Sequence, residues 1–379
     1  MVKREFKMII KSAALIFTLL LLSISTLIAA VNTEPLARPV IPQVRAMGGA
    51  FTAVANDEKA VFYNPAGYAT IDDDKISVFS LSISANIDRP ALKVYGALAT
   101  GVNVFLPSNQ EKYFSNTTIA QGVGGPIYFG RVGNNFGFSF YNSFSSTLDS
   151  RPGGFAPFAE YLAYSDLGFV GGYGFELPFL DNLYAGFNLK VILRAKIETS
   201  GTLADVLSTL EDTSHTPLAK AIGFGGDVGF LYRPVPSFSV GFAVTDFFGT
   251  WFSDWEIMTF SEEEYPRSYI KPRIPFGVAL YPLATSGETE DIDRLVIALD
   301  YSDLLDYTSF LSNIKFGVSF RSLKVISVYG GFDGGFLAGG VGLSFKIFHT
   351  SLVYYVDELG AYPGANPVQN LLLNFAFRW

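Results

Sequence analysis

Apolar and polar residues alternate with a period of two in many separate segments of this 379-residue chain. Residues 294–301, 314–321 and 341–347 show the pattern. The last segment is the clearest, with a polar or small face opposite an apolar face made of Leu371, Leu373, Phe375, Phe377 and Trp379. Because the side chains of a β-strand point alternately to its two faces, the pattern predicts an all-β fold.

The apolar faces of these segments suit lipid better than water. An apolar strand at a free chain end would be an aggregation hazard in water. No second run of about 18 apolar residues follows residue 30, which excludes a bundle of membrane-spanning helices. A soluble β-sandwich also alternates, but so many Phe-rich faces favour strands with one face to lipid and one to a lumen. We therefore predict a transmembrane antiparallel β-barrel.

The spacing of the segments predicts about fourteen strands, with the barrel formed by residues 75–379. Counted back from the C-terminus, the predicted outer loops are mostly long: residues 88–124, 148–160, 200–220, 249–272, 304–312, 333–335 and 358–370. The predicted periplasmic turns are mostly short: residues 132–135, 178–182, 233–237, 284–293, 322–324 and the vicinity of Phe348 and His349. This asymmetry is typical of outer-membrane barrels. Residues 91–105 also resemble a strand, but an odd number would separate the termini, so either this segment or residues 75–87 belongs to a loop or a longer first hairpin.

The first 30 residues are typical of an export signal. A basic leader with Lys3, Arg4, Lys7 and Lys11 precedes an uncharged stretch that ends in small residues before Val31. We predict a cleavable signal peptide over residues 1–30, export to the periplasm and insertion into the cell outer membrane. The alternative is a retained inner-membrane anchor, because the apolar run approaches the spanning length of about 20 residues.

Composition restricts the chemistry that we expect. A formal net charge of −8 without a basic stripe argues against a nucleic-acid partner. The absence of Cys excludes disulfides, thiolate metal sites and cysteine catalysis. His215 and His349 stand alone, and Asp72–Asp74 lacks further oxygen ligands at a defined spacing. The sequence thus predicts no metal, no cofactor and no enzymatic activity, with a barrel hydrolase as the alternative class.

Small residues dominate the segment before the first predicted strand. Gly48-Gly49 interrupts short helical turns, Asp57 follows, and Asn64-Pro65-Ala66-Gly67 ends the segment at a turn. Small residues allow backbones to pack closely. We therefore predict that residues 31–74 form a compact plug, called the hatch below.

Residues 44–69 closely resemble the N-terminal hatch of the FadL family, the outer-membrane transporters of long-chain fatty acids and other hydrophobic compounds. The related PorV-like barrels share the Gly-Gly-Ala-Phe and Asn-Pro-Ala-Gly elements. The resemblance implies a barrel of the predicted strand number, plugged by the hatch. The terminal strand also resembles the signal that the barrel assembly machinery reads, here Phe375, Phe377 and Trp379.

The resemblance further implies an inward kink in the third strand that opens a lateral route into the bilayer. On our count this strand is residues 136–147, where Asn142 and Ser143 interrupt the alternation. The alternative is an unbroken strand with a polar outer end.

Two predicted outer loops carry apolar residues where polar ones are usual. In the first, a helix is predicted behind the capping pair Thr202 and Asp205, with one apolar face made of Leu203, Val206, Leu207 and Leu210. The next loop is rich in aromatic residues, among them Phe248, Trp251, Phe252 and Trp255. Family members use these two loops as a hydrophobic landing groove, which is implied here if the two faces meet. The alternatives are a helix that covers the barrel and an aromatic girdle at the membrane interface.

The function predicted on this basis is passive uptake of hydrophobic compounds such as long-chain fatty acids. The expected partners are the outer-membrane bilayer, a hydrophobic small molecule and the barrel assembly machinery. The alternative is a PorV-like assembly or secretion adaptor that transports nothing itself. A continuous apolar tunnel would favour transport, and a lumen sealed by polar side chains would favour the adaptor.

Deletion of residues 371–379, or Trp379→Ala, is expected to block membrane assembly, because an unclosed barrel leaves unpaired backbone groups in lipid at several kcal/mol each. The measurement is the amount of heat-modifiable barrel in outer-membrane fractions. Normal amounts after the deletion would contradict the predicted topology.

Overall fold

The computed structural model describes residues 32–71, 75–153, 156–260, 264–284, 294–306, 309–322, 325–360 and 362–378. The predicted signal peptide, the acidic segment Asp72–Asp74 and the terminal Trp379 lie outside the described residues. None of the described helices is long and apolar enough to cross a membrane.

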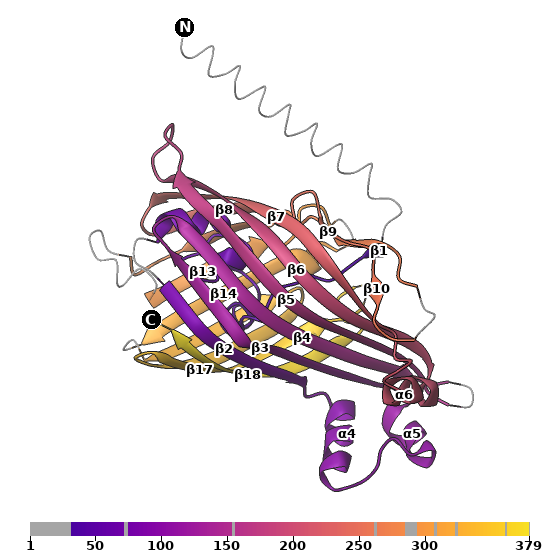
Figure 1. The fold of residues 1–379 in the computed structure, drawn as a ribbon. Coiled ribbons are helices and arrows are strands. Elements are labelled where there is room, and N and C mark those ends of the chain that lie inside the picture. Colours follow the sequence, from indigo (N-terminus) through magenta and orange to yellow (C-terminus); the bar gives the residue numbers. More distant parts are fainter. Residues whose placement is uncertain are drawn as a thin grey trace.

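A closed barrel of 14 antiparallel strands forms the molecule, as predicted (Figure 1). The first strand pairs with the last, and β8 pairs with β12, so no edge is left open. The strands are β2 (Lys75–Asn86), β3 (Thr117–Gly133), β4 (Phe136–Arg151), β5 (Phe158–Glu176), β6 (Leu183–Thr202), β7 (Leu218–Val235), β8 (Phe238–Val244), β12 (Phe276–Leu280), β13 (Leu295–Tyr301), β14 (Ile314–Ser322), β15 (Ile326–Asp333), β16 (Phe336–Phe345), β17 (Phe348–Glu358) and β18 (Pro367–Arg378).

Strand length divides the wall into a tall and a short side. Strands β3 to β7 have 16 to 20 residues, whereas β8, β12 and β13 have 5 to 7. Beyond β8, three short strands continue the wall: β9 (Thr250–Phe252), β10 (Glu256–Ile257) and β11 (Ser268–Ile270). The N-terminal β1 (Asn32–Thr33) pairs in parallel with β11.

Side chains alternate between the two faces of the wall as the sequence pattern predicts. On β18, Leu371, Leu373 and Phe377 are exposed on the outer face, whereas Leu372 and Ala376 are buried. The Phe375 and Phe377 rings lie 6.3 Å and 5.6 Å from the Phe348 ring of β17, measured between centroids. The last strand is therefore packed into the outer surface at the point where the barrel closes.

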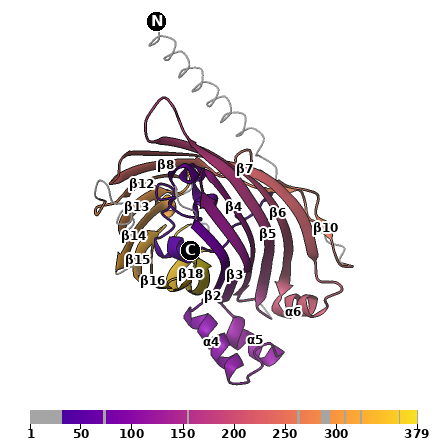
Figure 2. The ribbon, with the colours of Figure 1, turned by 60° about the vertical axis from the view of Figure 1, so that its left-hand side comes forward.

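The hatch residues 41–71 lie inside the barrel, as Figure 2 shows along the lumen. Their helices are α2 (Pro42–Ala46), α3 (Ala60–Tyr63) and the 3₁₀ helix η1 (Pro65–Thr70). Helix α2 packs against β15 to β18, and η1 against the opposite strands β4 to β7. The hatch thus contacts both sides of the wall, nearer the end with the short turns, called the turn end below.

Residues 91–105 are not a strand. They include helix α4 (Arg89–Ala99), followed after a turn by α5 (Pro107–Phe114). Ala91, Val94 and Ala97 are buried at a spacing of three, which is a helical period that a search for alternation overlooks. This segment is the loop between β2 and β3, so the count of fourteen is unaffected.

The last turn, predicted to be periplasmic, was predicted two residues too late. It lies at Lys346 and Ile347, between β16 and β17, and Lys346 adopts a positive φ of 53°. His349 is consequently inside β17.

Gly48→Ala is expected to loosen the hatch, and Gly49→Ala is its matched control. Both glycines have positive φ, 62° and 87°. A Cβ on Gly48 would clash with the Phe332 backbone, whereas one on Gly49 would have ordinary contacts from 3.6 Å. Both variants share the strain of a non-glycine residue at positive φ. The clash makes Gly48→Ala less stable than Gly49→Ala by about 1–3 kcal/mol. We expect Gly48→Ala to increase ion conductance in planar bilayers towards that of a barrel without residues 31–70. Equal conductance of the two variants would contradict close packing at Gly48.

Candidate functional site

A cavity of about 840 Å³ lies between the hatch and the end of the barrel that carries the long loops, called the loop end below. Hatch residues Val40, Ile41 and Val44 form its floor, and Tyr164 and Asp166 of β5 belong to its wall. Many of the lining side chains are charged, namely Arg38, Arg45, Arg194, Lys271, Arg273, Lys315, Asp166, Asp300, Asp303, Asp306, Asp333, Asp357 and Glu358. The cavity is therefore not a continuous apolar tunnel.

Several of the cavity charges form ion pairs. Arg45 of the hatch lies 2.8 Å from Asp357 of β17, and Lys315 of β14 pairs with Asp333 of the neighbouring strand β15. Arg273 differs, because its Nε is buried and has no hydrogen-bond partner. Burial, together with the charge of Arg38, lowers the pKa of Arg273. The cavity thus holds an arginine that would gain from an anionic partner.

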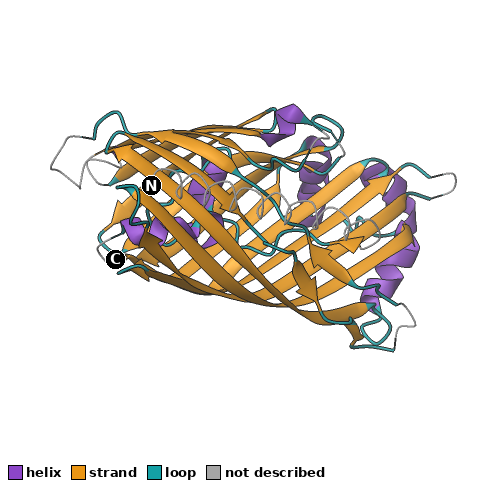
Figure 3. Ribbon diagram, turned by 90° about the horizontal axis from the view of Figure 1, so that it is seen from above, coloured by secondary structure: helices purple, strands orange, loops and turns teal. Residues whose placement is uncertain are grey.

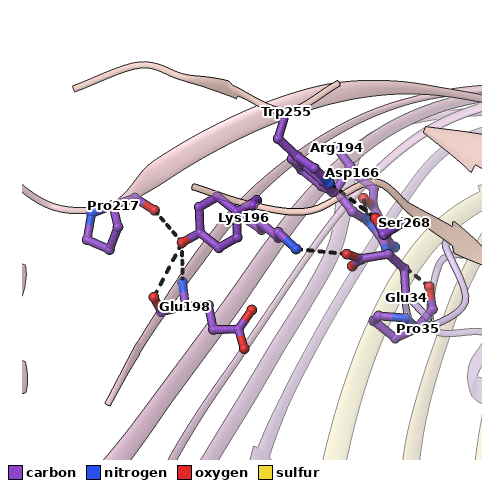
Figure 4. Close-up of polar contacts among 10 residues, drawn as sticks. Glu34, Pro35, Asp166, Arg194, Lys196, Glu198, Pro217, Trp255 and Ser268 are labelled. Atoms are coloured by element: carbon purple, nitrogen blue, oxygen red, sulfur yellow. Dashed lines mark hydrogen bonds and ion pairs between the residues drawn. The ribbon is translucent and has the colours of Figure 1, made fainter. Parts of the chain in front are cut away.

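A cluster of buried charges ties the N-terminal segment to the tall wall (Figure 4). Glu34 lies 2.8 Å from Lys196 Nζ and 3.5 Å from Arg194 Nη1. Arg194 also donates two hydrogen bonds to Asp166, at 2.7 and 2.8 Å. This cluster was not predicted, although Arg194 and Lys196 at alternate positions of an apolar strand are a signal for a polar inner face.

The predicted hatch residues meet the wall directly. The Asn64 side chain donates to the carbonyls of Thr52 (2.9 Å) and Phe230 (3.0 Å), and accepts a bond from Ala66 N–H. Pro65, Ala66 and Gly67 are buried in η1. These bonds fix the turn that ends the hatch against β7.

Near the turn end, a second charge cluster joins the hatch to the last strand. Asp57 pairs with Lys59, and Glu58 lies 3.3 Å from Arg378 of β18. Burial alone would raise the pKa of Glu58, but Lys59 and Arg378 hold it below its ordinary value. Asp57, a predicted hatch residue, therefore pairs within the hatch, and its neighbour Glu58 makes the ionic contact with the wall.

The wall is interrupted in β3, at Gly125, Pro126 and Ile127. The pairing register shifts on both sides, between Ser77 and Ser82 of β2 and between Gly124 and Tyr128 opposite β4. Gly125 adopts a φ of +86°, and a Cβ there would clash with the Ser80 carbonyl. A small cavity of about 20 Å³ lies behind the interruption, lined by hatch and wall residues that include Val40, Ile41, Tyr128 and Arg378.

The predicted break at Asn142 and Ser143 was on the wrong strand. Strand β4 pairs with β5 without a shift through both residues. Asn142 instead bridges the interruption in β3, since its side chain accepts from Ile127 N–H and donates to Gly125 C=O, each at 2.9 Å. Ser143 lines the large cavity. Gly124-Gly125-Pro126 was the sequence signal, because Pro cannot donate to a ladder and Gly tolerates a bend.

The two halves of the predicted landing groove do not meet. Helix α6 (Leu203–Glu211) forms with its predicted capping box. Leu203 and Val206 are buried, and Leu207 and Leu210 pack against the same cluster, which belongs to α4, α5 and the ends of β3 to β5. Helix α6 therefore packs against the first outer loop.

The aromatic residues of the later loop form a separate cluster. Phe252 and Trp255 pack with Ile192, Ala221 and Ile270, and with Leu36 and Ala37 of the N-terminal segment. Trp251 stacks on Tyr269 with centroids 4.8 Å apart, and Phe248 is exposed. The N-terminal segment, and not α6, covers this cluster.

Neither histidine has the geometry of a catalytic relay. Ser214 Oγ (3.0 Å) and Asp212 Oδ2 (2.8 Å) both contact Nδ1 of His215, whereas a Ser-His-Asp relay uses both ring nitrogens. His349 contacts Ser344 Oγ within the wall. Among the residues described, no group of three His, Asp or Glu side chains is placed to hold a metal ion.

Comparison with solved structures identifies the fold. A variant of TodX, a monoaromatic hydrocarbon channel, matches with a TM-score of 0.53 and 12% identity over 90% of this chain and 98% of its own. The monoaromatic hydrocarbon channel CymD matches with a TM-score of 0.51 and 11% identity over 90% and 97%. A Pseudomonas aeruginosa FadL homologue matches with a TM-score of 0.46 and 11% identity over 92% and 99%.

The chain has the fold of the FadL-type channels. The resemblance seen in the sequence is thus confirmed for the architecture. No sequence-family model and no curated protein matches the chain. At this low sequence identity, the comparison shows that the fold is shared. It does not show which residues of this chain contact a ligand.

Asn142→Leu is expected to destabilise the barrel by about 2–4 kcal/mol, because it leaves Ile127 N–H and Gly125 C=O without their partner. Ser143→Ala is the control, since it changes the next residue without touching the bridge. Urea unfolding in detergent micelles measures the difference. Equal midpoints would show that Asn142 does not support the interrupted strand.

Proposed function

We propose that this chain is an outer-membrane barrel through which hydrophobic small molecules, such as long-chain fatty acids, enter the cell down their concentration gradient. The observation that carries the proposal is the position of three hatch residues. Pro39, Val40 and Ile41 line both the large cavity and the small cavity behind the interruption in β3. Displacement of this short segment would join the cavity to the wall beside the bilayer.

A lateral exit suits an apolar ligand for two physical reasons. The β2–β3 ladder is already interrupted between Ser77 and Ser82, so opening at this point breaks fewer backbone hydrogen bonds than opening within the paired parts of the same ladder. The direct path to the turn end passes the charge cluster of Glu58, Lys59 and Arg378. Removing apolar surface from water is favourable by about 25 cal/mol per Å², so an apolar ligand is more stable on the path into lipid.

The cavity suits a ligand with an apolar body and an anionic end. Its volume of about 840 Å³ falls in the range of small-molecule sites. Val40, Ile41 and Leu162 offer apolar contacts, and Arg273 offers a donor without a partner. The structural neighbours TodX and CymD are monoaromatic hydrocarbon channels, which supports the hydrophobic class. The preference for an anionic end depends on Arg273 Nε alone, because the lining holds seven acidic and six basic side chains.

A reversible disulfide tests the route. The chain has no Cys, and a Cβ on Gly124 would lie 3.8 Å from Val40 N, so Val40→Cys with Gly124→Cys fastens the hatch segment to the wall. Uptake of radiolabelled oleate into proteoliposomes is expected to be about tenfold slower for the oxidised variant than for the reduced variant. Reduction of the disulfide is expected to restore it.

Ala46→Cys with Gly340→Cys is the control, because a Cβ on Gly340 would lie 3.3 Å from Ala46 Cβ, away from residues 39–41. This Cβ would also approach Leu352 O and Val353 Cγ2 to 2.8 Å, so heat-modifiability first shows that the variant forms the barrel. This pair fastens the hatch elsewhere and is expected to leave uptake unchanged. Equal uptake by the oxidised and reduced test variant would exclude the proposed route.

One observation favours a second function. The charged and largely paired lining of the lumen is what a barrel needs if it docks partner proteins and transports nothing. If the parent protein neither binds nor passes oleate or toluene, the PorV-like adaptor replaces the transporter.

A further inference from the structure

The hairpin of α4 and α5, residues 89–114, packs on the outer face of the barrel wall. Tyr164 and Asp166 of β5 line the cavity, so Ala159 and Tyr161 at odd positions point away from it. Both belong to the cluster formed with Val94 and Phe114 of the hairpin. Figures 1 and 2 show the hairpin projecting sideways from the loop end, and Figure 3 shows it at that end from above.

Several large apolar side chains of this hairpin are exposed. Leu92 is 50% exposed and Leu106 49%, and Leu98, Val102 and Phe105 are exposed as well. Only Phe105 of these five has a described ring contact, with Phe114 of the same hairpin. In contrast, the exposed residues of the neighbouring helix α6 are mainly small or polar: Ala204, Asp205, Ser208 and Glu211. The apolar surface is thus a property of the hairpin and not of the outer loops in general.

The hairpin is attached just above the apolar belt of the wall. Phe136, Phe140 and Phe144 are exposed along the outer face of β4, and Leu148, further along the same face, packs under the hairpin. From Phe144 to Leu148 the strand rises ~13 Å along its length, or ~10 Å along the membrane normal at a tilt of about 40°. From Phe136 the height to Leu148 is ~30 Å, close to the ~25 Å of a lipid-facing band. The hairpin therefore lies at the outer rim of that band.

The charge of the hairpin also fits a position at the membrane interface. The hairpin contains three basic residues, Arg89, Lys93 and Lys112, and one acidic residue, Glu111, in a chain of net charge −8. Lys93 Nζ donates to the Lys112 carbonyl at 2.6 Å, and the ammonium groups of Lys93 and Lys112 lie 5.2 Å and 4.9 Å from the Tyr113 ring. Two cations are thus held together next to exposed apolar side chains.

We propose that residues 89–114 form an interfacial anchor that inserts its apolar surface into the outer leaflet of the membrane around the barrel. Apolar side chains enter the acyl boundary, and the basic residues meet the phosphate groups of lipid heads. The anchor extends the lipid-facing belt sideways, beside the strands β2 and β3 that carry the wall interruption. It does not depend on which function the barrel has.

Single-cysteine labelling tests the anchor, because the chain has no native Cys. The variants Leu98→Cys and Leu106→Cys are labelled with a bimane fluorophore and placed in nanodiscs of phosphatidylethanolamine and phosphatidylglycerol. The nanodiscs also contain a phosphatidylcholine with brominated acyl chains, which quenches a fluorophore that lies in the lipid. Ile127→Cys, at an exposed position of the lipid-facing wall, is the positive control, and Ser208→Cys on α6 is the negative control.

Brominated lipid is expected to quench the labels at Leu98 and Leu106 at least about half as strongly as the label at Ile127, and about fivefold more than at Ser208. Quenching no stronger than at Ser208 would overturn the proposal. Protection from aqueous iodide without quenching by lipid would also overturn it, and would assign the surface to a protein partner. Heat-modifiability of each variant confirms that the barrel has formed.

Discussion

Every backbone N–H and C=O group that faces lipid must find a hydrogen-bond partner within the protein, and the rest of this structure follows from that requirement. The wall satisfies this requirement because it is closed: β18 pairs with β2, and β8 pairs with β12. Where β3 departs from the ladder, the side chain of Asn142 takes the place of the missing strand partner. The interruption of β3 is thus bridged on the β4 side by a single side chain, whereas its β2 side stays unpaired between Ser77 and Ser82.

A closed wall of this size encloses more space than its own side chains fill, and the hatch occupies part of the remainder. Glycine on facing surfaces, such as Gly48 and Gly331, allows hatch and wall backbones to touch. Charges that would be costly alone in the lumen are paired there, with Glu34 of the N-terminal segment and Arg194 and Asp166 of adjacent strands as the most buried example. Removal of one partner leaves an unpaired buried charge, so these contacts fix the position of the N-terminal segment.

Much of the barrel could be predicted from the sequence, because alternation is a local property of each strand. The closing strand, the strand count and the capping box of Thr202 and Asp205 rest on neighbouring residues alone. Helix α4 was missed, because its buried residues repeat every three positions next to a segment that alternates. The strand interruption was placed on β4 because the search followed polar residues, although Gly125 and Pro126 bend β3.

Contacts between distant segments could not be predicted in this way. Glu34 and Arg194 are separated by 160 positions, and no local pattern joins them. The proposed groove failed for the same reason, since helical spacing at Leu207 and aromatic content at Trp255 say nothing about whether the two surfaces meet. Three-dimensional packing determines such contacts, and α6 packs against helices of the first outer loop, which were not predicted as helices.

The unequal length of the strands has a consequence for local stability. On one flank, β8, β12 and β13 have 5 to 7 residues, and the short strands β9 and β11 continue the wall beyond β8. On the other flank, β3 to β7 run for 16 to 20 residues. A short strand is held by few ladder hydrogen bonds, so its local unfolding breaks fewer of them than the unfolding of a long strand. The flank of short strands is therefore the side of the barrel on which local opening costs least.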